Sequence, residues 1–179
     1  ISIFFRTTTK IKKKRIVCWS YHFNKYSCNP RYIAEYLSIY HPDEYDIYWI
    51  QNKNSDISLI DNRIKMVHPY TLRYFYIINS AHILIYNTRT YLFNDFWIKK
   101  KGQIYIMTWH ATMEIKKIEK DAEKSLGEYY VKYAKRDSKM CDLILSGCRY
   151  YTNRFKESFW YNGEILEKGN PRNDILFKD

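Results

Sequence analysis

"YIMTWHATMEIKKIEKD", residues 105–121, is the stretch that decides the fold. It opens as a short apolar run, passes through Thr108, Trp109 and His110, and then becomes rich in lysine. The apolar run has the length of a buried strand, which we place at 103–108. In a layered α/β sheet, ligands bind beyond the carboxyl ends of the strands. His110, two residues past the expected strand, is therefore predicted to lie at the edge where chemistry usually happens.

The remaining sequence alternates strand-like and helix-like segments. Short apolar runs predict strands, and apolar residues spaced by three and four predict helices. This alternation indicates an α/β layered domain with a mostly parallel sheet and helices on both faces. The other expected strands are 16–20, 45–50, 64–67, 83–86, 143–145 and 165–166, and the expected helices are 30–40, 71–79, 126–133 and 151–159.

The first of these helices has readable ends. Asn29 is expected to cap its amino end, and Pro30 suits the first helical position. The pair His41-Pro42 is expected to stop it. One apolar face is predicted from four residues at helical spacing, namely Ile33, Tyr36, Leu37 and Tyr40.

Composition limits the kinds of partner. The chain has 179 residues and a formal net charge of +11, from 30 Lys and Arg against 19 Asp and Glu. That excess favours an anionic partner, such as nucleic acid, acidic lipid or a phosphorylated substrate, and equally fits a solvated basic surface. The charge run at 10–15 is the most basic segment. No apolar run reaches the ~20 residues that cross a bilayer. The four cysteines are expected to be reduced thiols, mostly packed in the interior of a cytoplasmic protein.

His110 has the chemistry of a base. An ordinary histidine titrates at about pH 6.5 and can accept a proton from an attacking hydroxyl at neutral pH. Thr108 and Thr112 place hydroxyls on either side, and a helix beginning near Thr112 would offer free N–H groups to an anion. Lys116 and Lys117 would add positive charge beside a phosphate. From spacing alone, a structural histidine bonded to the backbone is the simpler interpretation.

Several classes of protein are not supported. The sequence has no Walker-type glycine loop and no GxGxxG, which argues against a P-loop nucleotidase and an ordinary dinucleotide dehydrogenase. There is no HxxxH and no acidic pair at ligand spacing, so no metal site is predicted. The aromatic residues mostly lie on helix faces or in strands, which is typical of core residues. Nucleic-acid binding, which uses exposed aromatic residues among basic ones, is therefore the least favoured activity. In "GNPRND", residues 169–174, Gly169 permits a tight turn, Arg172 could pair with a phosphate or with a neighbouring carboxylate, and Asp174 could cap a following helix. An ordinary boundary between a loop and a helix would explain the same residues.

Motifs in a fixed order resemble one known family. "TWHAT…IKKIEKD", "AKRDSKMCDLILSGCRYYT", "FWYNGEIL" and "GNPRND" are similar, in this order, to motifs of the CDP-glycerol glycerophosphotransferases of teichoic-acid and capsule synthesis. "SCNPRYIAEYL", residues 27–37, resembles an early stretch of the same family. The resemblance covers residues 15–177.

The resemblance implies a GT-B enzyme with two Rossmann-like domains. Residues 1–179 would form the amino-terminal, acceptor-side domain, and the donor-binding carboxyl-terminal domain is expected to lie outside them. The enzyme would transfer glycerol phosphate, or a related polyol phosphate, from a CDP-alcohol to a hydroxyl of an anionic polyol-phosphate or glycan-lipid acceptor, and release CMP. No cofactor is implied. Such an enzyme is expected to be cytoplasmic and peripheral at the inner face of a bacterial cell membrane.

The resemblance also implies roles for single residues. His110 would be the base. The expected substrate contacts are Asn29, Thr108, Trp109, Thr112, Lys116, Lys117, Arg172 and Asp174. Ala111 departs from the pattern, because the family usually has glycine there, and alanine disfavours positive φ.

Two other functions stay open. One is a nucleotide-sugar glycosyltransferase of envelope biosynthesis with the same GT-B fold. The other is a non-catalytic basic domain that binds an acidic membrane surface or an anionic polymer, for which the charge run at 10–15 is the motivation.

Overall fold

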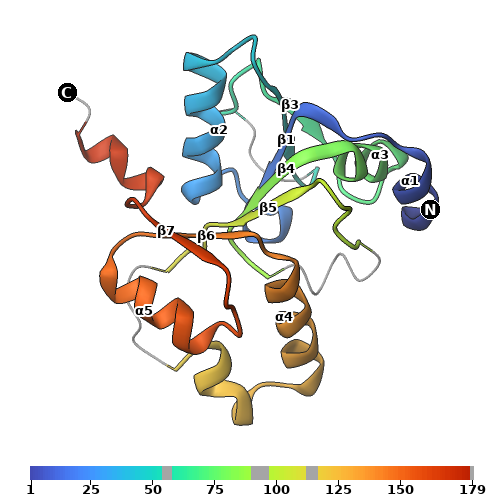
Figure 1. Cartoon of the computed structure of the whole chain (residues 1–179). Coiled ribbons are helices and arrows are strands. Elements are labelled where there is room, and N and C mark those ends of the chain that lie inside the picture. The colour runs from blue at the N-terminus through green and yellow to red at the C-terminus, as the bar shows by residue number, and fades with distance from the viewer. Residues whose placement is uncertain (54–57, 90–96, 112–116, 178–179) are drawn as a thin grey trace.

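A computed structural model describes residues 1–53, 58–89, 97–111 and 117–177. Its centre is a seven-stranded sheet in the order β3-β2-β1-β4-β5-β6-β7, and every neighbouring pair is parallel (Figure 1). The expected parallel sheet is thus confirmed. The strands are β1 Lys12–Trp19, β2 Asp46–Ile50, β3 Lys65–Val67, β4 Ala81–Tyr86, β5 Ile104–Met107, β6 Leu143–Ser146 and β7 Glu164–Glu167.

Helices connect the strands and cover the sheet on both faces. The α-helices are α1 Ser2–Thr8, α2 Cys28–Tyr40, α3 Leu72–Ser80, α4 Glu128–Met140 and α5 Arg149–Ser158, and the 3₁₀ segments are η1 Tyr21–Phe23, η2 Glu119–Ser125 and η3 Pro171–Phe177. In Figure 1, α2 lies on one side of the sheet and α4 and α5 lie on the other.

The strand order places a reversal beside β1. The chain runs outward from β1 through β2 to β3, and α3 then returns it to β4, on the other side of β1. At such a reversal, the loops that follow the two neighbouring strands separate and leave a crevice at their carboxyl ends. The crevice at the ends of β1 and β4 is where this fold is expected to bind a ligand.

Alternating side chains of the buried strands build two cores. In β1, Val17 and Trp19 face a cluster that α3 and α5 complete, whereas Ile16 and Cys18 face a cluster with Ala34 of α2. A strand buried on both faces has no polar side, which explains the continuous apolar runs in the sequence.

Three local predictions were wrong. Strand β1 begins at Lys12, inside the charge run, because its first residues pair with the start of β4 and remain exposed. Helix α2 is capped at Ser27, and Asn29 lies inside its first turn. Tyr36 and Tyr40 are exposed, because α2 turns Ala34 toward the sheet instead.

The expected ends of the other elements hold to within a few residues, except that α4 continues to Met140. Helix α1 had no counterpart among the expected elements. Among the described residues, no helix is long and apolar enough to cross a membrane.

A buried ion network joins five segments near the carboxyl edge of the sheet. Arg89, three residues past the end of β4, is paired with Glu119 at 2.9 Å and with Asp137 of α4 at 3.1 Å. It also donates to the carbonyl of Phe159, beyond α5, and Tyr105 of β5 donates to Asp137. All three charged side chains are at most 2% exposed.

Replacing Arg89 with Met is expected to lower the free energy of unfolding by about 3–5 kcal/mol, because two carboxylates stay buried without their cation. Denaturant titration measures this loss. The matched control is Lys135→Met, which breaks the exposed pair with Glu123 and should cost about 0–1 kcal/mol. Equal losses in the two variants would contradict a structural role for the network.

Candidate functional site

The imidazole of His110 is held at the carboxyl edge of the sheet by one backbone contact. Its Nδ1 lies 2.8 Å from the carbonyl oxygen of Asn87, the first residue after β4. A carbonyl can only accept a hydrogen bond, so Nδ1 carries the hydrogen and Nε2 has the lone pair. The contact therefore fixes the tautomer in which Nε2 can accept a proton.

The surroundings of His110 keep it neutral. Burial lowers the pKa of His110, and the guanidinium of Arg172 lowers it further, whereas the bond to Asn87 and the charge of Glu119 act in the opposite direction. The net shift is downward from about 6.5. His110 is half-buried, so part of it remains accessible from the surface.

Aromatic rings enclose the imidazole. The indole of Trp109 lies 4.4 Å from it, and the ring of Tyr21 lies 5.8 Å from it, both measured between centroids. Trp109 has φ 50, in the left-handed region that a bulky residue seldom adopts. Ala111, described in the same loop, does not share this conformation. Ala111 therefore does not need the positive φ that would favour glycine at this position.

Asn29 ties three segments together beneath the site. Its Nδ2 donates to the carbonyl of Thr108 at 3.2 Å and to the side chain of Asn170 at 3.4 Å, and its Oδ1 accepts from the backbone N–H of Arg172. Asn29 is 1% exposed. Asn29 thus positions the backbone of these segments, and the buried hydroxyl of Thr108 likewise bonds to backbone carbonyls. The substrate contacts expected for both residues stay predictions.

Arg172 reaches the histidine from the far end of the chain. Its Nη1 donates to the carbonyl of His110 at 2.8 Å and lies 3.4 Å from Sγ of Cys28. Gly169, with φ 92, makes the turn that delivers this segment, as expected. Gly147 has no room for a Cβ, which would lie 2.2 Å from Nδ2 of Asn170.

A hollow of about 350 Å³ opens beside this cluster. Its wall includes Tyr21, the start of α2 at Ser27 and Cys28, and Arg172. Two of these wall residues contact His110: Tyr21 lies against its ring and Arg172 donates to its backbone carbonyl.

Two predicted site residues, Thr112 and Lys116, lie outside the described residues. Lys117 is exposed and lines a separate hollow with Lys120 and Lys124. The helix expected near Thr112 is not tested; the first described helical segment after it is η2.

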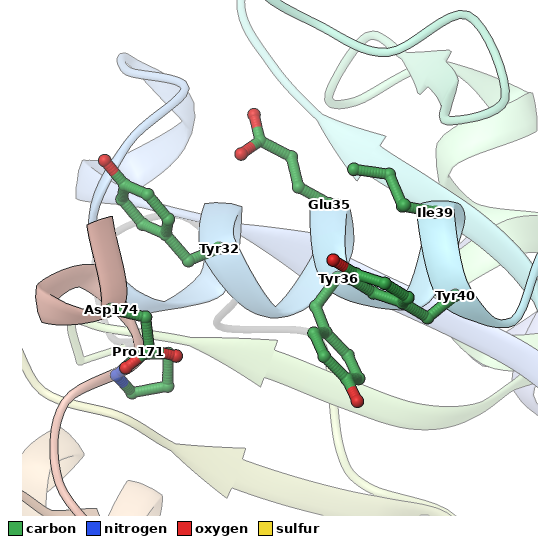
Figure 2. A pocket seen from close by; sticks show the side chains of 7 residues that line it. All are labelled: Tyr32, Glu35, Tyr36, Ile39, Tyr40, Pro171 and Asp174. Carbon is green, nitrogen blue, oxygen red and sulfur yellow. The ribbon is translucent and has the colours of Figure 1, made fainter. Parts of the chain in front are cut away.

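Asp174 is not part of the cluster. It lies within η3, so it caps no helix, and this expectation was wrong. Figure 2 shows it in a hollow on the outer face of α2, beside Pro171 and Tyr32, with Tyr36 and Tyr40 further along the helix.

Sequence reasoning missed part of the cluster. Tyr21 belongs to no motif, Cys28 lies in the stretch at 27–37 without a predicted role, and Asn87 directly follows the strand predicted at 83–86. His22, in η1, has a pKa lowered by burial and by its proximity to His110. All four cysteines are free, and three are buried, as expected. Within the described residues, no group of three or more His, Cys, Asp or Glu could hold a metal ion.

Comparison with solved structures gives the same fold. A variant of the wall teichoic acid polymerase TagF matches with a TM-score of 0.83 and 31% identity, over 98% of this chain and 43% of that one. The Rossmann-like fold of GT-B type, expected from the sequence, is confirmed by this likeness.

Sequence comparison agrees. A teichoic acid poly(glycerol phosphate) polymerase of Staphylococcus epidermidis is 34% identical over 93% of the chain, and one of Bacillus subtilis is 31% identical over 94%. The chain spans 23% of the length of either relative. The pattern of the family described as CDP-Glycerol:Poly(glycerophosphate) glycerophosphotransferase matches residues 1–179. The chain belongs to that family.

Proposed function

We propose that the protein transfers glycerol phosphate, or a related polyol phosphate, from a CDP-alcohol to a hydroxyl of a teichoic-acid-like or capsular acceptor. His110 is the base. The acceptor oxygen forms a bond to the β-phosphorus, the bond from that phosphorus to the oxygen of CMP breaks, and the proton of the hydroxyl passes to Nε2. The observation that carries the proposal is the bond from Nδ1 to Asn87, because it leaves Nε2 as the basic nitrogen.

The fold supports the position of this chemistry. His110 lies beyond β5, next to the reversal between β1 and β4, where parallel sheets bind ligands. TagF has also been solved after a soak with CDPG. Because the chain spans less than half of TagF, we assign residues 1–179 to the acceptor side and the donor site to a further domain.

Replacing His110 with Ala in the full-length protein is expected to lower kcat for CMP release by roughly 10²–10⁴-fold, because the attacking hydroxyl loses its base. CMP release from CDP-glycerol and CDP-ribitol is followed beside UDP release from a UDP-sugar, which also tests the alternative of a nucleotide-sugar glycosyltransferase. The matched control is His82→Ala at the opposite edge of the sheet, where Nδ1 bonds to the carbonyl of Lys13. Unchanged turnover in His110→Ala would remove His110 as the base.

The activity is expected to persist below the pH at which an ordinary histidine becomes protonated. The folded state lowers the pKa of His110, so the neutral base remains at pH 6.5 and is lost only as pH falls further. Arg172→Gln removes a neighbouring positive charge and should raise this pKa, which moves the acidic limb of the kcat/KM profile to higher pH. A limb that stays in place, or moves to lower pH, would contradict this assignment.

A peripheral position on an acidic membrane is the second part of the proposal. Helix α1 exposes Ile1, Ile3 and Phe4, and the charge run that follows exposes its lysines. Arg15 is not available, because it is buried and paired with Asp46. Apolar side chains beside exposed cations are typical of a surface that lies on anionic lipid.

The double variant Lys13→Gln/Lys14→Gln is expected to bind vesicles containing phosphatidylglycerol roughly 30-fold more weakly, since each cation near an acidic surface contributes about 1 kcal/mol. Flotation across a salt series measures this. Lys120→Gln/Lys124→Gln, which removes the same charge from η2, should change binding far less. Binding that is indifferent to salt or to lipid charge would count against the membrane surface.

A further inference from the structure

Three buried polar groups close to His110 have no hydrogen-bond partner among the described residues. They are Nδ2 of Asn87, Oγ1 of Thr88 and Nε1 of Trp109. Asn87 is 0% exposed, and Thr88 and Trp109 are each 7% exposed. Buried polar groups in folded proteins are nearly always paired, so a cluster of exceptions at one place requires an explanation.

The orientation of the Asn87 amide is fixed by chemistry. Its Oδ1 accepts a hydrogen bond from the backbone N–H of Tyr21 at 3.0 Å. Exchanging Oδ1 and Nδ2 would turn a donor toward that donor, so the unfilled position must be the N–H₂ group. The indole Nε1 of Trp109 can only donate. Both groups are therefore hydrogen-bond donors that lack an acceptor among the described residues.

Both donors belong to residues that touch the proposed base. The backbone carbonyl of Asn87 accepts from Nδ1 of His110 at 2.8 Å, and the Trp109 indole lies 4.4 Å from the imidazole. Trp109 is held in this place with φ 50, in the strained left-handed region. Strained backbone and unfilled donors cluster where a ligand completes the structure.

The acceptors of the same segments are already occupied. The carbonyl of Asn87 is used by His110, that of His110 by Arg172, and that of Thr108 by Asn29. What is left is a set of N–H donors beside a guanidinium. A ligand that fits must therefore bring oxygen atoms that accept hydrogen bonds, and negative charge suits it better than positive charge.

We propose that Asn87 Nδ2 and Trp109 Nε1 bind oxygen atoms of the terminal polyol phosphate of the acceptor, and so hold its hydroxyl next to His110. The identity of this ligand rests on the proposed function. Asn87 thereby acts twice, since its backbone orients the base and its side chain contacts the substrate. Thr88 contributes the third polar group, a hydroxyl.

Trp109→Phe removes the N–H and keeps a ring against His110. In the full-length protein, it should raise the KM for a glycerol phosphate acceptor at least tenfold and change kcat less, because the hydrogen bond to the acceptor is lost. Asn87→Asp keeps the acceptor for Tyr21 and places a carboxylate in front of the phosphate, so it should raise KM further.

The matched control is Trp49→Phe. The Nε1 of Trp49 is also buried, but it donates to Oε1 of Gln51 at 2.8 Å. This variant should lower the unfolding midpoint and leave KM unchanged. Both tryptophans are buried, so KM is the readout that separates the two variants. If Trp109→Phe also leaves KM unchanged, its Nε1 holds a structural water and the proposal is overturned.

A binding measurement separates this proposal from the proposed function. The five tryptophans give indole N–H signals in a ¹H–¹⁵N spectrum, and Trp109→Phe identifies that of Trp109. Glycerol 3-phosphate should shift this signal downfield to saturation; inorganic phosphate and glycerol, added separately, tell which oxygens are bound. Absence of a shift with all three overturns the inference, even if CMP is released. A saturating shift in a protein that releases no CMP supports the site and refutes the transfer.

Discussion

One buried guanidinium, that of Arg89, connects the segments on which the site is built. Its charge needs Glu119 and Asp137, and these acids come from η2 and α4, far along the chain. Because an unpaired charge inside a protein is very costly, the three groups must assemble together. The consequence for function is local. Arg89 lies two residues from Asn87, so anchoring Arg89 also anchors the carbonyl that orients His110. The network extends into the sheet through Tyr105, which donates a hydrogen bond to Asp137. The ring of Tyr105 stacks on that of Tyr86, with the ring centroids 4.2 Å apart.

Because the Arg89 network anchors these segments, the neighbouring site can keep polar groups that have no hydrogen-bond partner among the described residues. The imidazole is held neutral, in one tautomer, by burial and a single carbonyl. Donors around it stay unfilled, and Trp109 stays in a strained conformation. A strained backbone and unpaired buried donors persist only where the surrounding structure holds them in place. They are typical of sites that recognise a ligand. Arg172 contributes from the opposite direction, because it bonds to the backbone of His110 and lowers its pKa, so the last motif of the sequence acts on the central one.

The site shows which contacts could be predicted from the sequence and which could not. His110 and Arg172 were predicted as neighbours of one ligand, and the structure brings them together. Asn29 was predicted to cap α2, but the helix starts at Cys28, two residues before the predicted start at Pro30. Its amide instead bonds to two backbone groups and to the side chain of Asn170. The family's usual glycine at Ala111 suggested positive φ there, whereas the positive φ belongs to Trp109. Thr112 and Lys116 lie outside the described residues and stay predictions. Such errors arise because caps and loop conformations depend on packing partners that are distant in sequence.

The sequence by itself determined the class of the fold and the identity of the central motif. Continuous apolar runs separated by helical spacing can bury themselves only as a parallel sheet covered on both faces, and polar residues that follow those runs must gather at one edge. Only the tertiary structure decided which of them meet. The Asn87 carbonyl, the Arg172 guanidinium and the Trp109 indole surround His110 because the strand order places β1, β4 and β5 side by side and brings η3 back across their ends. Hydrogen bonds act over about 3 Å, and residues 23 and 62 positions apart come within that distance only after the sheet has formed.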